Sequence, residues 1–220
     1  MLSGQPQEKV RMLYLLVALG AYLLGSIPSG YLIGKSRGVD LRTQGSGNIG
    51  ATNALRVLGK KWGYLCFALD AGKGVLSVLL AKYTIAPAVG LDPVISSIVA
   101  AVCTVLGHNF PVWLKFKGGK GVATSAGAVI GLFPLPVFVC SVLVWVITFK
   151  VTRIVSVASM LGAISLSLAL LVLWLLHSSG VVLAQVVIGI ALSAMMIWRH
   201  RSNIARLMAG TEPRFEKRSR

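Results

Sequence analysis

Apolar segments of membrane-spanning length are the feature that most restricts how this chain can fold. Six stand out, at about residues 12–34, 62–83, 93–107, 121–149, 154–176 and 181–198. A helix needs about 20 mainly apolar residues to cross a bilayer. Hydrophobic residues make up 55% of the 220 and charged residues only 13%. The sequence therefore predicts an all-α integral membrane protein, and despite the net charge of +16 we expect no nucleic-acid partner.

The fourth apolar segment is too long for one ordinary span, and it contains Phe133-Pro134-Leu135-Pro136. Proline breaks or kinks a helix, so this segment is either one kinked helix or two short ones. Loop 35–61 and the tail after residue 198 are both rich in Lys and Arg, which predicts that both are cytoplasmic. They lie on one side only if the chain turns at Pro134.

We therefore predict a seven-transmembrane-helix bundle with an outside N-terminus and a cytoplasmic C-terminus. Its spans are about 12–34, 62–83, 93–107, 121–133, 135–149, 154–176 and 181–198, of which the fourth and fifth are two short central helices. No internal repeat or long linker is visible, so residues 1–220 are expected to form a single domain. The first apolar run is longer than the core of a usual signal peptide, which favours a retained helix.

A glycine-rich loop follows the first span and is bracketed by two arginines. It reads Gly45-Ser46-Gly47-Asn48-Ile49-Gly50-Ala51-Thr52-Asn53, between Arg42 and Arg56. Small residues let backbone N–H groups approach a ligand, and guanidinium groups match phosphate oxygens. Residues 45–50 also fit the GxGxxG dinucleotide pattern, but no βαβ context surrounds them. The loop is interpreted as a phosphate-binding loop, with a plain flexible loop as the alternative.

A second glycine motif, Lys117-Gly118-Gly119-Lys120-Gly121, precedes the fourth span. It lacks the spacing and the Ser or Thr of an ATP-binding P-loop. A basic loop that only sets topology would need charge but no paired glycines. Glycines at a helix start suit a turn whose N–H groups bind an anion. If this loop converges with the other basic loops, they form a cationic pocket at the cytoplasmic interface.

Buried ionisable groups form a third candidate. Asp70 and Lys73 lie three residues apart inside the second span, where they can share a helix face. They are interpreted either as an internal ion pair or as site residues, and His108 either as a site residue or as a helix-end residue. The histidines are scattered and acids are scarce, so we expect no metal site and no cofactor.

The motifs together resemble the bacterial acyl-phosphate:glycerol-3-phosphate acyltransferase family. The resemblance rests on Gly25-Ser26-Ile27-Pro28-Ser29-Gly30, the loop from Asp40 to Asn53, Gly107-His108 with residues 116–124, and Arg199-His200-Arg201-Ser202-Asn203-Ile204 with Gly210 and Glu212. It covers nearly the whole chain. It implies a seven-span enzyme of the bacterial inner membrane, with its active site facing the cytoplasm. Such an enzyme transfers an acyl group from acyl phosphate to the 1-hydroxyl of glycerol 3-phosphate, giving lysophosphatidate.

The resemblance also assigns roles to residues. It implies catalytic roles for Ser46, Arg56, Lys120, His200 and Asn203, and substrate or phosphate binding by Arg42, Gly45, Gly47, Asn48, Gly118, Gly119, Gly121, Ser156 and Ser159. Glu212 is expected to be structural. The implied partners are the lipid bilayer, the two substrates and, through a functional link, an enzyme that forms acyl phosphate. Direct transfer is favoured over an acyl-enzyme, because no Ser–His–Asp set is visible.

A rival hypothesis from the residues is a small phosphate or organic-anion transporter. It is motivated by the same cationic loops together with Asp70 and Lys73. Transporters commonly contain internal repeats and broken helices at the membrane midplane. The absence of a visible repeat, and the clustering of polar motifs on one predicted side, favour the enzyme.

Overall fold

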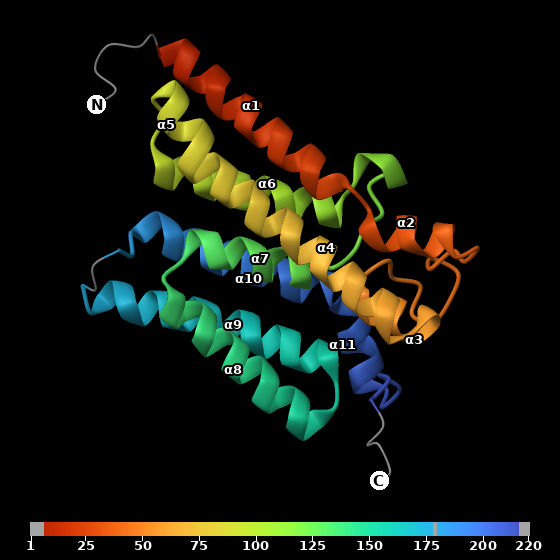
Figure 1. Cartoon of the computed structure of the whole chain (residues 1–220). Helices are drawn as coiled ribbons and strands as arrows, with labels where there is room; N and C mark the ends of the chain where they lie inside the picture. Colours follow the sequence, from red (N-terminus) through yellow and green to blue (C-terminus); the bar gives the residue numbers. More distant parts are fainter. Residues whose placement is uncertain (1–6, 178–179, 216–220) are drawn as a thin grey trace. The chain divides into compact units, whose positions relative to one another are not determined.

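The computed structural model describes residues 7–177 and 180–215, and within these ranges all regular structure is helical (Figure 1). The helices are α1 (Gln7–Ser26), α2 (Ser29–Ser36), α3 (Ala51–Leu58), α4 (Lys60–Leu79), the π-helix η1 (Leu80–Ile85), α5 (Ala86–Val89), α6 (Pro93–Asn109), the 3₁₀ turn η2 (Val112–Leu114), α7 (Val122–Leu132), α8 (Leu135–Thr152), α9 (Val155–Leu175), α10 (Leu183–Arg199) and α11 (Arg201–Met208). Lys217, Arg218 and Arg220 of the predicted basic tail, and the first residues of the predicted outside N-terminus, lie outside the described residues.

Five helical segments of the described chain are long and apolar enough to cross a membrane. They are Gln7–Ser36, Lys60–Val89, Pro93–Leu114, Leu135–Thr152 and Val155–Leu175, and α10 with α11 forms a sixth if that bent pair is counted as one span. The chain is therefore a multi-pass membrane protein. The predicted seven spans also require α7, which is apolar but has only 11 residues. The count of seven and the orientation of the termini stay predictions.

The helix break at Pro134 is confirmed. Helix α7 ends at Leu132 and α8 begins at Leu135, with Pro134 in extended conformation as the N-cap residue. Proline has no backbone N–H to continue the preceding helix, but it is well accommodated at a helix start. The long fourth apolar segment is thus two helices rather than one kinked helix.

Three other boundaries differ from the sequence prediction. The first span is broken after Ser26, because Pro28 cannot donate the backbone hydrogen bond that would continue α1. The second continues past residue 83, through the π-helix, to Val89. The predicted basic tail after residue 198 contains a further helix, α11, which is bent by 54° from α10.

The chain divides into two compact units, one ending at Leu132 and the next beginning at Phe133. In unit 1, α4 packs against α3, α6 and α7, and α6 packs against α1. Glycines permit this close approach: a Cβ atom at Gly25 would overlap the Thr104 backbone, and one at Gly74 the Thr124 backbone. Such small-residue contacts are typical of helix packing in membranes. Whether the two units act as a single domain stays a prediction.

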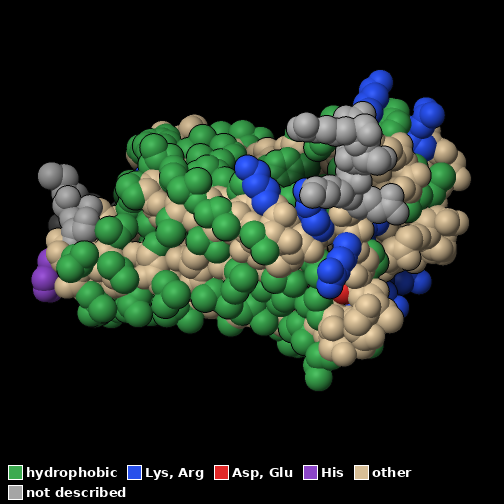
Figure 2. Space-filling view, turned by 90° about the horizontal axis from the view of Figure 1, so that it is seen from below, with side chains coloured by type: hydrophobic (Ala, Val, Ile, Leu, Met, Phe, Trp, Pro, Cys, Tyr) green, Lys and Arg blue, Asp and Glu red, His purple; other side chains and the backbone are tan. Residues whose placement is uncertain are grey.

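In unit 2, α9 packs between α8 and α10. Hydroxyl groups link these helices: Ser141 Oγ donates to Gly162 O over 2.8 Å, and Ser193 Oγ donates to Ala163 O over 2.8 Å. Long apolar side chains point outward along the helices of both units, and Figure 2 shows hydrophobic side chains over much of the face in view. An apolar exterior of this kind is suited to lipid rather than to water.

Candidate functional site

The predicted phosphate loop lies between α2 and α3 in unit 1, and a buried asparagine shapes it. Asn53, in the first turn of α3, is only 2% exposed. Its Oδ1 accepts the Ser46 N–H over 2.8 Å, and its Nδ2 donates to the carbonyls of Leu41, Gln44 and Asn48. One side chain therefore closes the loop. Asn53 belongs to the glycine-rich motif, but the sequence predicted no role for it.

The glycines of this loop are required by its backbone. Gly45 and Gly47 have φ of 59° and 70°, a left-handed conformation that glycine adopts at little cost. A Cβ atom at Gly45 would also overlap the Asn53 side chain. Asn48 Oδ1 accepts the Gly50 N–H over 2.8 Å, which forms a local turn immediately before α3. Ser46 stays exposed at the tip of the loop, where a soluble ligand could reach its hydroxyl.

The two arginines that bracket the loop are in different environments. Arg42 forms a two-pronged ion pair with Asp40, with its NH2 2.6 Å from Oδ2 and its Nε 2.9 Å from Oδ1. These hydrogen bonds from Arg42 lower the pKa of Asp40 to about 2. The Arg42 guanidinium also lies 4.7 Å from the centroid of the Tyr31 ring. Arg56 lies in the last turn of α3 and its side chain is exposed.

The second glycine loop is packed against the end of α6. The N–H groups of Gly118 and Gly119 donate to Asn109 O over 3.2 Å and to His108 O over 3.1 Å. A Cβ atom at Gly119 would overlap the His108 ring, and one at Gly118 would overlap the His108 carbonyl. Gly121 has a φ of 80° and leads directly into α7. The paired glycines are thus explained by a turn pressed onto α6.

Two polar side chains beside this turn were missed by sequence reasoning. Asn109 and Thr124 are both fully buried, yet among the described residues neither Asn109 amide atom nor Thr124 Oγ1 has a hydrogen-bond partner. The Asn109 Oδ1 atom lies 2.8 Å from where a Gly121 Cβ would be, and Thr124 is in the first turn of α7. Unsatisfied polar groups in a buried position are costly, so a bound ligand or water is expected to pair with them.

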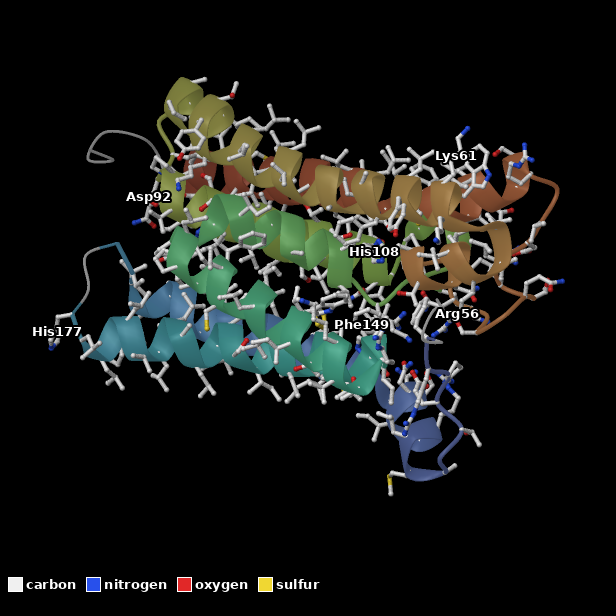
Figure 3. All side chains as sticks on the ribbon, turned by 60° about the horizontal axis from the view of Figure 1, so that its bottom comes forward. Arg56, Lys61, Asp92, His108, Phe149 and His177 are labelled. Atoms are coloured by element: carbon white, nitrogen blue, oxygen red, sulfur yellow. The ribbon has the colours of Figure 1, made fainter. Side chains whose placement is uncertain are left out.

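Asp70 is at the centre of a buried cluster in unit 1. It is 2% exposed, its Oδ1 lies 3.0 Å from Lys73 Nζ, and His108 Nδ1 lies 3.6 Å from the same oxygen. The predicted internal ion pair between Asp70 and Lys73 is confirmed. In Figure 3, His108 lies nearer to Arg56 and Lys61 than to Asp92, which is at the other end of unit 1. The cluster therefore lies toward the end that carries the glycine loops.

In unit 2, three polar side chains surround Glu212. Ser156 Oγ donates to Glu212 Oε1 over 2.7 Å, Asn203 Nδ2 donates to Oε1 over 2.6 Å, and Arg206 Nε donates to Oε2 over 2.7 Å. Burial would raise the pKa of Glu212, but these three hydrogen bonds outweigh it and lower the pKa. Glu212 thereby joins α9 to α11, which is the kind of contact its predicted structural role requires.

The remaining predicted residues of unit 2 also have partners within that unit. His200 is at the bend between α10 and α11, with Nδ1 2.8 Å from Met196 O. Because a carbonyl only accepts, this contact assigns the proton to Nδ1, and a neutral ring then carries its lone pair on Nε2. Ser159 Oγ donates to Val155 O and accepts from Trp145 Nε1.

The structure thus divides the predicted site residues between its two units. Arg42, residues 45–48 and Arg56 form one group around the first loop, and residues 118–121 form a second group beside Asp70 and His108. Ser156 and Asn203 both bind Glu212 in unit 2. Among the described residues, no group of three His, Cys, Asp or Glu could hold a metal ion.

Comparison with known proteins gives one consistent result. The family model described as glycerol-3-phosphate acyltransferase matches residues 15–210. A glycerol-3-phosphate acyltransferase of Synechococcus sp. (strain CC9902) is 45% identical over 207 residues, which are 94% of this chain and 96% of the relative. A protein of the same name from Clostridioides difficile (strain 630) is 42% identical over 200 residues, covering 90% and 94%.

Two solved structures are also similar. Both are crystal structures of PlsY (YgiH), an integral membrane glycerol 3-phosphate acyltransferase. The glycerol 3-phosphate form has a TM-score of 0.81 and 44% identity, and covers 92% of this chain and 96% of that one. The lysophosphatidic acid form has a TM-score of 0.79 and 43% identity, covering 92% and 95%.

Proposed function

This chain belongs to the glycerol-3-phosphate acyltransferase family, and we propose that it transfers an acyl group from acyl phosphate to the 1-hydroxyl of glycerol 3-phosphate. The products are lysophosphatidate and inorganic phosphate. The hydroxyl oxygen forms a new bond to the acyl carbon, the bond from that carbon to the phosphate oxygen breaks, and the hydroxyl proton leaves to a base. The similar solved structures are a glycerol 3-phosphate form and a lysophosphatidic acid form, which supports this substrate and this product.

The second glycine loop is the observation that carries the proposal. Residues 118–121 lead into the N-terminus of α7, whose first-turn N–H groups and positive dipole end favour an anion. Lys120 adds a cation there, and the buried amide of Asn109 offers a further donor. We assign this loop to a substrate phosphate. A residue larger than glycine at position 118 or 119 would overlap His108.

The first loop is assigned to phosphate binding and to orientation of the reacting groups. Ser46 presents an exposed hydroxyl, and Arg56 supplies a guanidinium from the last turn of α3. Acyl phosphate already carries a good leaving group, so positioning and charge stabilisation are the main tasks of such an enzyme. This chemistry favours direct transfer without an acyl-enzyme. A stable acyl ester on Ser46, trapped with labelled acyl phosphate, would contradict it.

In unit 2, His200 and Asn203 are proposed to act in proton transfer and hydroxyl orientation. With Nδ1 donating to Met196 O, a neutral His200 has the lone pair on Nε2 that a general base requires. The phosphate of a substrate is the competing base. Ser156 and Ser159 stay proposed substrate contacts, although their hydroxyls already bind Glu212 and Val155 O.

We further propose that the protein is in a bacterial inner membrane with its loops on the cytoplasmic side. The Lys and Arg residues of segment 35–61 support this orientation, because cytoplasmic loops are enriched in both. The acyl tail of the donor would lie along the apolar helices, and the donor would come from a separate acyl-phosphate-forming enzyme.

The deciding experiment is formation of lysophosphatidate by detergent-solubilised protein from acyl phosphate and glycerol 3-phosphate. Acyl-CoA and acyl carrier protein serve as alternative donors and should give no product. Activity without a sealed membrane also separates this proposal from anion transport. Absence of product with all three donors, or equal rates with acyl-CoA, would overturn the proposed reaction.

A further inference from the structure

Asp70 connects three segments of unit 1 that are far apart in the sequence. Its ion-pair partner Lys73 donates to Ile27 O over 2.8 Å, at the break between α1 and α2. That lysine is itself buried, and Ile27 O, which also accepts the Ser29 N–H over 3.1 Å, lies between the end of α1 and the start of α2. The pair therefore anchors the break in the first span to α4.

A second connection leads to the first glycine loop. Cys66 is one turn before Asp70 on α4 and is fully buried. Its Sγ lies 3.7 Å from Asp70 Oδ2 and 3.9 Å from Ile49 O. Gly30 packs against the same carbonyl, and a Cβ atom there would overlap it. The loop residue that follows Asn48 is thus held against the helix that carries Asp70.

The third connection leads to the second glycine loop. The His108 ring lies between Asp70 and Gly119: its Nδ1 is 3.6 Å from Asp70 Oδ1, and its Nε2 side faces Gly119. The loop is also fixed to α6 by the hydrogen bonds from Gly118 and Gly119 to the carbonyls of Asn109 and His108. A shift of the His108 ring would consequently be transmitted to the turn that leads into α7.

We propose that Asp70 is a positioning residue that holds the two glycine loops in one fixed arrangement through Lys73, Cys66 and His108. The inference deepens the proposed function and rests on it, because it takes these loops as the phosphate-binding elements. Asp70 itself touches neither substrate. A buried carboxylate must keep its charged partner, so the cluster allows few alternative geometries.

The test compares Asp70→Asn with the double variant Asp70→Asn/Lys73→Gln. The single variant leaves a buried lysine without its carboxylate and could unfold the protein. The double variant removes both charges together. If the single variant unfolds, the double variant still provides the exchange and kinetic measurements. Each purified variant is measured by amide hydrogen exchange without substrate, and then by kinetics with varied glycerol 3-phosphate.

Exchange at Gly118 and Gly119 should rise most, because their N–H groups are bonded to the end of α6. Exchange at residues 46–50 should rise less, since Asn53 closes that loop independently of Asp70. The KM for glycerol 3-phosphate should increase by roughly 10- to 100-fold, the range expected when a positioning contact is displaced by about 1 Å. A smaller change is expected in kcat.

Ser77→Ala is the matched control. Ser77 is buried on α4, and its hydroxyl accepts a hydrogen bond from Thr104 Oγ1 of α6 over 2.5 Å, so the variant weakens contact between the same two helices. It should lower the thermal midpoint without changing loop exchange or KM. If it raises KM as much as the Asp70 variants do, general destabilisation explains the effect and the positioning role is wrong.

The proposal and the proposed function fail in different ways. An inactive wild-type protein would contradict the proposed function. Hydrogen exchange in the two glycine loops would still test the role of the Asp70 cluster. An active wild type whose folded Asp70 variants show unchanged loop exchange and unchanged KM would remove the positioning role alone.

Discussion

Two carboxylates organise polar clusters in this protein, and their surroundings differ. Asp70 of unit 1 is 2% exposed within a helix long enough to span a membrane, and it is paired with a buried lysine. Glu212 of unit 2 is 9% exposed near the C-terminal end of the described chain, and it binds a hydroxyl, an amide and a partly exposed arginine. Deep among apolar helices a carboxylate needs a full counter-charge, whereas nearer to water hydrogen bonds contribute a larger share.

The largest effect should come from filling the space where the Asp70 cluster meets the second loop. In Gly119→Ala the new methyl group would overlap the His108 ring, so the loop or the ring must move. We expect a loss of activity of about 100-fold, which a displacement near 1 Å can cause if this loop binds substrate as proposed. The measurement is the initial rate of lysophosphatidate formation. Gly72→Ala on α4, where a Cβ atom meets nothing within 4 Å, is the control and should stay active.

The next largest effect should be on stability, and it should be larger for Asp70 than for Glu212. Asp70→Ala should lower the free energy of unfolding by about 3–5 kcal/mol, because it leaves Lys73 buried and unpaired. Glu212→Ala should cost about 1–3 kcal/mol, the range for polar partners left unsatisfied. Denaturation in detergent measures both. An equal or reversed order would show that burial does not distinguish the two clusters.

A smaller effect is expected from the titration of Glu212. Its pKa is lowered in the folded protein, so its contribution to stability is fully present above the ordinary glutamate pKa of about 4.3 and is lost as the pH falls through the lowered value. The difference in thermal midpoint between wild type and Glu212→Gln should therefore shrink on acidification below about pH 4. A difference that is constant with pH would contradict the assigned ionisation.

The smallest effect should come from the exposed pair of Asp40 and Arg42. Both side chains are substantially exposed, and exposed ion pairs contribute little and are screened by salt. Asp40→Asn should leave the thermal midpoint unchanged. If Arg42 binds phosphate, releasing it from Asp40 should lower the KM for glycerol 3-phosphate at low salt. An unchanged KM would indicate that Arg42 serves the loop rather than the ligand.

Much of the fold could be predicted because the apolar runs and the prolines act locally. Pro134 ends one helix and starts the next whatever surrounds it, and Asp70 with Lys73 can pair because a helix places them on one face. The π-helix after Leu79, and α11, depend on packing and could not be predicted from periodicity.

The candidate site was predictable in its motifs but less so in its contacts. The glycine loops were recognisable because each combines closely spaced glycines with neighbouring cations. The role of Asn53 depends on four contacts that no spacing encodes. The sequence assigned no role to Asn109, and only its buried amide, which has no hydrogen-bond partner among the described residues, indicates that a polar group is expected beside it.

The second glycine loop has a consequence for how substrates meet. It adjoins Asp70 through His108, and Asp70 is ten residues along α4 from Lys60, roughly 15 Å at 1.5 Å per residue. Irregular backbone at such a depth must be covered by protein or border an aqueous recess. Under the proposed function, the water-soluble glycerol 3-phosphate would therefore reach its site below the level at which α4 begins, and the acyl chain of the donor could stay in the lipid.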